Sequence, residues 1–360
     1  VLFLLQYGGG LQEGVYLVGS GSTGTGLAFC TLAVVHFGAM AVGSWYFKLP
    51  KEGWAPKGWT PPVQPAGSVV ASSSMGHVQA MKTPQFYLMW ALICGNSVSG
   101  LVLISSAKTI MTDVFAGALP LLVTGAFATG YVSAISAANA GGRLGWALLS
   151  DWAGRRNLFF VFGLGAPLAA CIPMVTHWAT TTGSVLPLYA FYGSTLLMIS
   201  FYGGLASLMP AYISDLFGLK HVGAIHGRLM TAWSAAAVIG PNVLSYLRRS
   251  SYNSACADLS SKVDPAAFER AFGAPVERLE ELVNANTVTI GRLMEIVPEG
   301  TIDPSPLLYD STLYTCSAML GVAFIANWAM SPVEKFHFEE DERREREAME
   351  KAKRGLEKDL

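Results

Sequence analysis

Apolar stretches of about 20 residues recur along the chain, separated by more polar segments of very different length. They cover Thr25–Phe47, Gln85–Ala107, Leu119–Leu149, Leu158–Trp178, Ser184–Ala211, Gly223–Leu247 and Ser311–Met330. A helix of that length matches the hydrocarbon core of a bilayer, which is about 30 Å thick. The pattern therefore predicts an all-α, polytopic membrane protein with about seven transmembrane helices.

Charged residues are unevenly distributed, which supports this prediction. Only 14% of the 360 residues are charged, against about 25% in a typical soluble domain. The first 249 residues carry 12 Lys or Arg and 5 Asp or Glu. This composition argues against an ordinary soluble domain, and we expect a lipid bilayer and no nucleic acid as a partner.

Basic residues alternate between the connections and predict the orientation in the membrane. The connections before the second helix, after the third and after the fifth carry Lys48, Lys51, Lys57, Lys82, Arg155, Arg156, Lys220 and His221. We assign these connections to the cytoplasmic side, and we expect a multi-pass protein of the plasma membrane. The tail from residue 334 then lies in the cytoplasm, and its mixed charges predict a solvated helix without a partner.

Motifs for enzymatic chemistry or metal binding are missing from the sequence. The five cysteines have no paired spacing, the six histidines form no metal-binding pattern, and no phosphate-binding loop or nucleophile elbow is present. We therefore expect neither a cofactor nor an enzyme.

Arg143 is the most informative residue, because it lies inside the third predicted helix. It precedes Asp151 by eight residues, which is about 12 Å along a helix. Inserting Arg so deep costs about 2.5–3.5 kcal/mol, so a partner or a hydrated cavity is expected. Asn139 lies one turn away, and Gly141 and Gly142 would let another backbone approach. Arg143 is either a structural arginine or a two-pronged donor for a carboxylate.

Other polar and aromatic positions could line the same hydrated path. Lys108 ends the second helix and is either an interfacial lysine or part of that path, with Asn96 three turns away on a similar face. Tyr202 in the fifth helix could equally be a packing residue. Trp233 follows in the sixth helix, where Gly240-Pro241 predicts a kink.

A short polar turn ends the third helix at the predicted cytoplasmic side. In Asp151-Trp152-Ala153-Gly154-Arg155-Arg156 a carboxylate faces two arginines across a glycine. Such a turn can hold neighbouring helix ends together and release them when the helices tilt. A related turn follows the fifth helix, where Asp215 precedes Gly218 and Lys220. We predict that both turns belong to a gate.

Several of these segments together resemble the major facilitator superfamily, within it the oxalate/formate antiporter and monocarboxylate transporter branch. They include Lys51-Glu52-Gly53-Trp54, Lys82-Thr83-Pro84-Gln85, Asn139-Ala140-Gly141-Gly142-Arg143, Asp151-x-x-Gly154-Arg155-Arg156 and Gly223-Ala224-Ile225-His226-Gly227-Arg228. The resemblance implies a twelve-helix transporter, of which this chain would contain the sixth to twelfth helices. It also implies that Arg143 faces the central cavity and pairs with the substrate carboxylate.

The resemblance further implies a domain organisation. Residues 1–48 would hold the last helix of the N-terminal half, and 49–83 a cytoplasmic linker with Trp54 and Trp59 as interfacial anchors. Residues 84–333 would form the C-terminal six-helix bundle, with an extramembrane insertion at 250–309 whose apolar spacing predicts a helical cap. Residues 334–360 would form the charged tail.

The implied function is alternating-access transport of a small organic anion, coupled to H⁺ or a counter-anion. Oxalate-handling members of the branch carry Lys where this chain has Trp233, which favours a monocarboxylate such as formate, lactate or pyruvate. Two other classes stay open. A seven-helix receptor fits the helix count, and a non-transporting sensor or scaffold could derive from the same fold.

Overall fold

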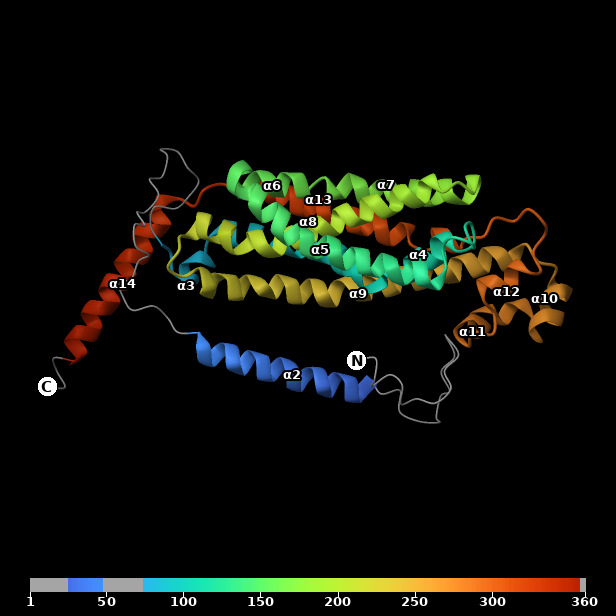
Figure 1. Ribbon diagram of the computed structural model, residues 1–360, viewed down its shortest axis with the longest axis horizontal. Coiled ribbons are helices and arrows are strands. Elements are labelled where there is room, and N and C mark those ends of the chain that lie inside the picture. The colour runs from blue at the N-terminus through green and yellow to red at the C-terminus, as the bar shows by residue number, and fades with distance from the viewer. Residues whose placement is uncertain (1–24, 48–73, 357–360) are drawn as a thin grey trace. The chain divides into compact units, whose positions relative to one another are not determined.

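The computed structural model describes residues 25–47 and 74–356, and every regular element in these ranges is a helix (Figure 1). The seven apolar windows correspond to α2 (Thr25–Tyr46), α4 (Pro84–Phe115), α5 (Gly125–Ala153), the successive helices α6 (Arg155–Phe162) and α7 (Gly165–Thr182), α8 (Leu186–Phe217), α9 (Val222–Ser261) and α13 (Asp310–Ala329). The predicted all-α architecture is confirmed. Lys48, Lys51, Lys57, Trp54 and Trp59 lie outside the described residues.

Five of these segments are long and apolar enough to cross a membrane, which is fewer than the seven expected. They are Gly26–Tyr46, Pro84–Phe115, Arg155–Ala179, Leu186–Phe217 and Ser305–Ala329. Helices α5 and α9 have sufficient length at 29 and 40 residues, but their polar side chains lower the mean hydropathy. The chain is thus a polytopic membrane protein in which two long helices are partly polar.

Two window boundaries differ from the prediction. Helix α5 begins at Gly125 rather than near Leu119, because Thr124 caps it and its side chain accepts a hydrogen bond from the backbone N–H of Phe127. Helix α9 continues through Pro241 and ends at Ser261, well beyond the expected Leu247.

The chain divides into two compact units, Val1–Gln64 and Pro65–Leu360. In the first unit the described element is α2, whose 22 residues are apolar on all sides, as expected for a membrane-spanning helix. The second unit contains the other long helices and every residue proposed for the functional site.

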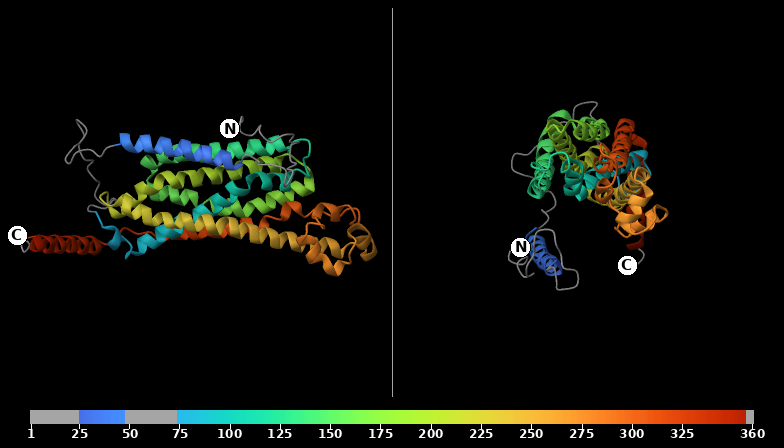
Figure 2. Two further views of the ribbon diagram at one scale, coloured as in Figure 1. Left: turned by 90° about the horizontal axis from the view of Figure 1, so that it is seen from below. Right: turned by 90° about the vertical axis from the view of Figure 1, so that its right-hand side faces the viewer.

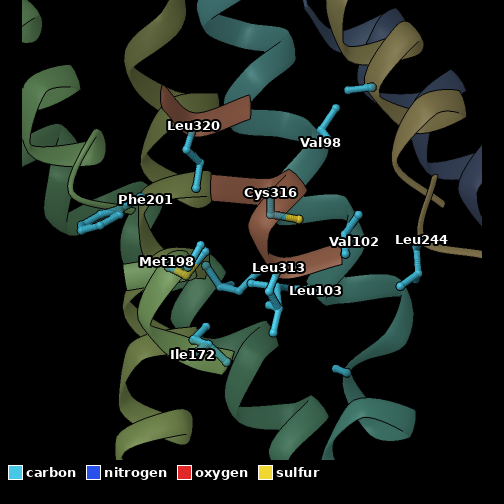
Figure 3. Packing of buried hydrophobic residues seen from close by; sticks show 14 of the residues in the cluster. Val98, Val102, Leu103, Ile172, Met198, Phe201, Leu244, Leu313, Cys316 and Leu320 are labelled. Atoms are coloured by element: carbon cyan, nitrogen blue, oxygen red, sulfur yellow. The ribbon is translucent and has the colours of Figure 1, made fainter. Parts of the chain in front are cut away.

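In the second unit, the core lies around α4, which packs against α9 and α13 (Figure 2). Figure 3 shows Val102 and Leu103 of α4 beside Met198 of α8 and Leu313 and Cys316 of α13. All five side chains are nearly inaccessible to solvent. This core fixes the positions of the helices that carry the site.

The segment after residue 250 is helical, as its apolar spacing predicts, but it is divided into short pieces. It contains the end of α9 and then α10 (Pro265–Phe272), η1 (Val276–Arg278), α11 (Leu279–Asn284), α12 (Ile290–Met294) and η2 (Ser305–Leu307). Phe268, Leu293 and Val288 are buried. These helices lie at the end of the bundle opposite α3 (His77–Ala80) (Figure 1).

The tail forms α14 (Lys335–Leu356), and the expectation that it has no partner is wrong. The Asp341 carboxylate accepts a hydrogen bond of 2.6 Å from the backbone N–H of Gly76. The Gln79 amide donates to Glu340 over 3.2 Å, and Phe338 is 8% exposed. The tail carries enough apolar and acceptor groups at its start to bind the segment that leads into α4.

Candidate functional site

Helices α5 and α8 approach so closely that only glycine fits between them. A Cβ atom at Gly142 would collide with the backbone of Ser200, and one at Gly203 would collide with the backbone of Asn139. The close approach is therefore confirmed for Gly142, whereas Gly141 faces open space. Because Arg143 follows Gly142 directly, this contact fixes its backbone relative to α8.

Arg143 lines a cavity of about 490 Å³ between α5, α8 and α9. The remaining lining residues are Tyr202 and Ala206 of α8 and His226, Met230, Trp233, Ser234 and Ala237 of α9. The α9 positions follow one another at helical spacing, so they form one face of that helix. The structure thus brings together three predicted residues that are far apart in the sequence, namely Arg143, Tyr202 and Trp233.

Tyr202 and Trp233 form one polar aromatic wall of the cavity. The indole N–H of Trp233 donates a 3.0 Å hydrogen bond to the hydroxyl of Tyr202, and the rings meet edge to face at 6.1 Å. The Tyr202 ring packs against Gly100 of α4, where a Cβ atom would collide with it. Both side chains are therefore held in place by contacts with neighbouring helices.

Asn139 orients the Arg143 guanidinium. Its side-chain oxygen accepts a hydrogen bond of 3.2 Å from Nε of Arg143 one turn later. In the described part of the chain, the two terminal nitrogens of Arg143 have no hydrogen-bond or ion-pair partner. The exposed guanidinium can therefore offer both nitrogens to one carboxylate.

The structure places Asn96 and Lys108 away from this cavity. Asn96 is 6% exposed and donates to the backbone oxygen of Leu92. It borders Tyr202 across a small internal void of about 10 Å³, which holds at most one water molecule. Lys108 is exposed near the far end of α4 and does not line the cavity.

The two predicted gate turns share the same backbone geometry. Gly154 ends α5 with φ of 83°, and Gly218 ends α8 with φ of 81°. In both turns the glycine N–H donates over 2.9 Å to a serine carbonyl four residues earlier, Ser150 or Ser214. Glycine is needed at these positions because other residues rarely adopt positive φ. Helices α5 and α8 therefore end alike at the same end of the bundle.

Arg155 connects the two turns. Its Nη1 atom lies 3.1 and 3.2 Å from the two carboxylate oxygens of Asp215. Its Nη2 atom lies 3.6 Å from Asp151, which is 74% exposed, whereas Asp215 is only 15% exposed. The stronger pair thus crosses from α6 to α8, and Asp151 is a second, weaker acceptor.

Arg156 contacts α13 instead. Its guanidinium donates over 3.2 Å to the backbone oxygen of Trp328, and its own backbone oxygen accepts a hydrogen bond from Asn327. Tyr212 of α8 in turn donates to Asn327. The paired arginines after Gly154 therefore hold two different helices at this end of the bundle.

Sequence reasoning missed most of the α9 contribution to the cavity. The sequence alone assigns His226 no role, although it lines the cavity together with Arg143. The helical spacing from His226 through Met230 to Trp233 and Ser234 was the signal that could have revealed this face.

Comparison with known proteins identifies one similar transporter. The chain is 27% identical over 173 residues to the oxalate:formate antiporter of Oxalobacter formigenes. The match covers 48% of this chain and 38% of that antiporter, so the aligned part spans well under half of the relative's length. No family model matches the chain. The resemblance expected from the motifs is thus supported as a distant similarity to an antiporter.

Proposed function

We propose that this chain forms the C-terminal part of a secondary active transporter for a small organic anion. The observation that carries the proposal is the exposed guanidinium of Arg143 in a cavity between α8, which is apolar enough to cross a membrane, and the more polar long helices α5 and α9. The distant similarity to an oxalate:formate antiporter supports it. The protein would move its substrate across the plasma membrane by alternating access, without enzymatic chemistry.

Arg143 is the proposed anchor for the substrate carboxylate, and Asn139 positions it. A guanidinium binds a carboxylate through two parallel hydrogen bonds, which a lysine cannot reproduce. The wall formed by Tyr202 and Trp233 would supply apolar contact and one hydroxyl beside the anion. Asn96 and Lys108 would act indirectly, Asn96 by packing beside Tyr202 and Lys108 nearer the outer end of the path.

The Arg155 pairs would control access from the cytoplasmic side. Arg155 can exchange Asp215 for Asp151 and stay paired with a carboxylate throughout, because both carboxylates lie within 4 Å of its guanidinium. Gly154 and Gly218 would serve as pivots at the two helix ends, and Arg156 would keep α6 on α13 during the exchange. Such a two-acceptor pair suits a gate whose states differ by a small free energy.

The central test replaces Arg143 in the complete protein reconstituted in proteoliposomes. Arg143→Lys should retain charge but lose most anion uptake, because a point charge does not form the two-pronged bond. Arg270→Lys is the matched control, since Arg270 is an exposed arginine outside the cavity and the gate and donates to the backbone oxygen of Ala266. Near-normal uptake by a well-expressed Arg143→Gln variant would contradict the proposal. A receptor or scaffold would show no substrate-dependent uptake in the unmodified protein.

We further propose that the substrate is a monocarboxylate such as formate, lactate or pyruvate. In the described cavity lining, Arg143 is the permanently charged residue, and Trp233 occupies the position where the resemblance implies a second cation. A dianion would enter with one uncompensated charge, and its desolvation costs several kcal/mol. At about 1.4 kcal/mol per decade this would give a preference of two or more decades.

Uptake competition tests the substrate class. Formate, lactate and pyruvate should compete strongly in the unmodified protein, and oxalate should compete weakly. Equal competition by oxalate would refute the role of Trp233. Loss of that competition in Lys108→Ala would transfer the role of second cation to Lys108.

His226 is the proposed group for coupling to H⁺, with a counter-anion as the alternative. It is the residue in the described cavity lining whose ordinary titration range includes neutral pH. A protonated His226 would add a second positive charge beside Arg143 and strengthen anion binding at low pH. In His226→Gln, uptake should lose its pH dependence between pH 5 and 8 while keeping its dependence on Arg143. Unchanged pH dependence would favour a counter-anion.

A further inference from the structure

A second and larger cavity lies at the opposite end of the bundle, where the 250–309 insertion meets the long helices. Its volume is about 640 Å³. Its walls come from α4 (Ser105, Thr109), from α9 (Arg248, Arg249), and from α11 and the turn after it (Asn284, Asn286). The insertion therefore supplies one wall of this cavity.

The lining is free of carboxylates, although the surrounding segment is acidic. Residues 250–309 contain 9 Asp or Glu and 4 Lys or Arg, yet neither Asp nor Glu is among the described residues that line the cavity. The polar groups there are hydroxyls, side-chain amides and two guanidinium groups. These groups donate hydrogen bonds to an anion, and the hydroxyls and amides can also pair with its hydroxyl groups.

The two arginines of this cavity differ in their charge balance. Arg248 donates to Asp113 over 2.8 Å and to Tyr309 over 2.8 Å, so its charge is compensated. Arg249 is exposed and donates over 2.7 Å to the side-chain oxygen of Asn284, which is neutral. In the described part of the chain, Arg249 forms no ion pair. One positive charge therefore remains uncompensated in the cavity.

We propose that this cavity is a second anion site, which binds a small hydroxylated carboxylate beside Arg249. The carboxylate would pair with Arg249, and Asn284 can turn its amide N–H groups toward the anion once it no longer accepts from the arginine. The hydroxyls of Ser105 and Thr109 would contact the rest of the ligand. The volume of about 640 Å³ admits a ligand of about four carbons together with water.

The site goes beyond the proposed transport function and does not depend on it. Arg143 and Arg249 line different cavities at different heights of the bundle. Binding at the second cavity can therefore be measured after the central site is removed. The proposal also gives the insertion a role, because Val283, Asn284 and Asn286 complete the pocket that α4 and α9 leave open.

The test uses isothermal titration calorimetry of the complete, detergent-solubilised protein with 3-hydroxybutyrate, a hydroxylated monocarboxylate of four carbons, as the probe. In the Arg143→Gln background, 3-hydroxybutyrate should still bind saturably. Adding Arg249→Gln should weaken this binding at least tenfold. Adding Arg270→Gln instead should not, because Arg270 is an exposed arginine of the same insertion that does not line the cavity and donates to the backbone oxygen of Ala266. Absence of saturable binding in Arg143→Gln, or equal binding with and without Arg249, would overturn the proposal.

Asn286 gives a second variant that preserves the fold. It has a φ of 54°, which glycine adopts without strain. Asn286→Gly therefore removes a lining amide while keeping the backbone path. We expect binding of 3-hydroxybutyrate to weaken several-fold with an unchanged unfolding temperature. Unchanged affinity for 3-hydroxybutyrate in this variant would exclude Asn286 from the site and count against the pocket as proposed.

Discussion

At each end of the helix bundle an arginine pairs with a carboxylate, but the two arrangements differ in whether the partners of the arginine also bond to each other. At the end that carries the Gly154 and Gly218 turns (the turn end), Arg155 lies 3.1 Å from Asp215 and 3.6 Å from Asp151. At the insertion end, Arg248 contacts both Asp113 and the hydroxyl of Tyr309. That hydroxyl also donates to Asp113 over 2.7 Å, which closes a three-membered network.

The difference indicates separate roles for the two ends. The network of Asp113, Arg248 and Tyr309 joins α4, α9 and the start of α13, and Tyr309 is only 1% exposed. Each member contacts the other two, so no alternative acceptor competes. Arg155 has two carboxylates within reach and can move between them. We therefore interpret the insertion end as a fixed clamp and the turn end as the mobile gate.

Removing the arginine of the clamp should have the largest effect on stability. Arg248→Met keeps the length of the side chain but leaves Asp113 and Tyr309 without a cation. Because the pair is partly exposed, we expect a loss of about 2–3 kcal/mol, below the range for fully buried pairs. Thermal unfolding in detergent measures this effect. A smaller loss than in Arg155→Met would reverse the assignment of clamp and gate.

Removing the stronger acceptor of the gate should have the next largest effect. In Asp215→Asn the arginine loses its charged partner on α8 but can still pair with Asp151. We expect a stability loss of about 1–2 kcal/mol and slower turnover with nearly unchanged substrate affinity. Uptake rates and equilibrium binding of formate separate these quantities. A large loss of affinity with normal turnover would place Asp215 in the binding site instead.

The clamp can also be weakened without removing a charge. Tyr309→Phe deletes the hydroxyl that bridges Arg248 and Asp113 but leaves their direct contact. We expect a loss of about 1 kcal/mol, with uptake of the substrate unaffected. Tyr314→Phe is a matched control, because Tyr314 is 51% exposed and lies in the first turns of α13, which Tyr309 directly precedes. Equal destabilisation by both variants would show that the network contributes nothing.

The smallest effect on stability is expected for the exposed acceptor of the gate. Asp151→Asn should change stability by at most about 0.5 kcal/mol, slow turnover modestly and leave affinity within a few-fold. Combined with Asp215→Asn, it should slow turnover more than the two single effects predict, because Arg155 then has no carboxylate to move to. Additive effects in this double-mutant cycle would argue against exchange between the two acceptors.

The helices and the gate turns could be read from the sequence because both depend on local patterns. In the described residues, the seven apolar windows each located a long helical segment of the predicted membrane region, and the glycine after Asp151 and Asp215 marked the two helix ends that require positive φ. The windows did not distinguish α5 and α9 from the more apolar helices. Both helices border the Arg143 cavity, and the polar side chains on that side lower their mean hydropathy.

The partners of these motifs depend on contacts between distant segments. Arg155 was expected beside Asp151, which is four residues away, but its closer partner is Asp215 from another helix. Likewise, the binding of α14 to Gly76 and Gln79 joins residues that are more than 250 positions apart. Charge patterning describes the solvated face of a helix and carries no information about such a contact.

The sequence by itself determined that this is an all-α membrane protein, that Arg143 is a charged residue inside a helix, and that glycines end α5 and α8. These properties follow from hydropathy, helical periodicity and backbone sterics, which act over a few residues. Only the tertiary structure placed Arg143, His226 and Trp233 around one cavity and brought Arg249 beside Asn284 of the insertion. Both cavities arise from the packing of helices far apart in the chain, because a cavity is a property of several surfaces at once.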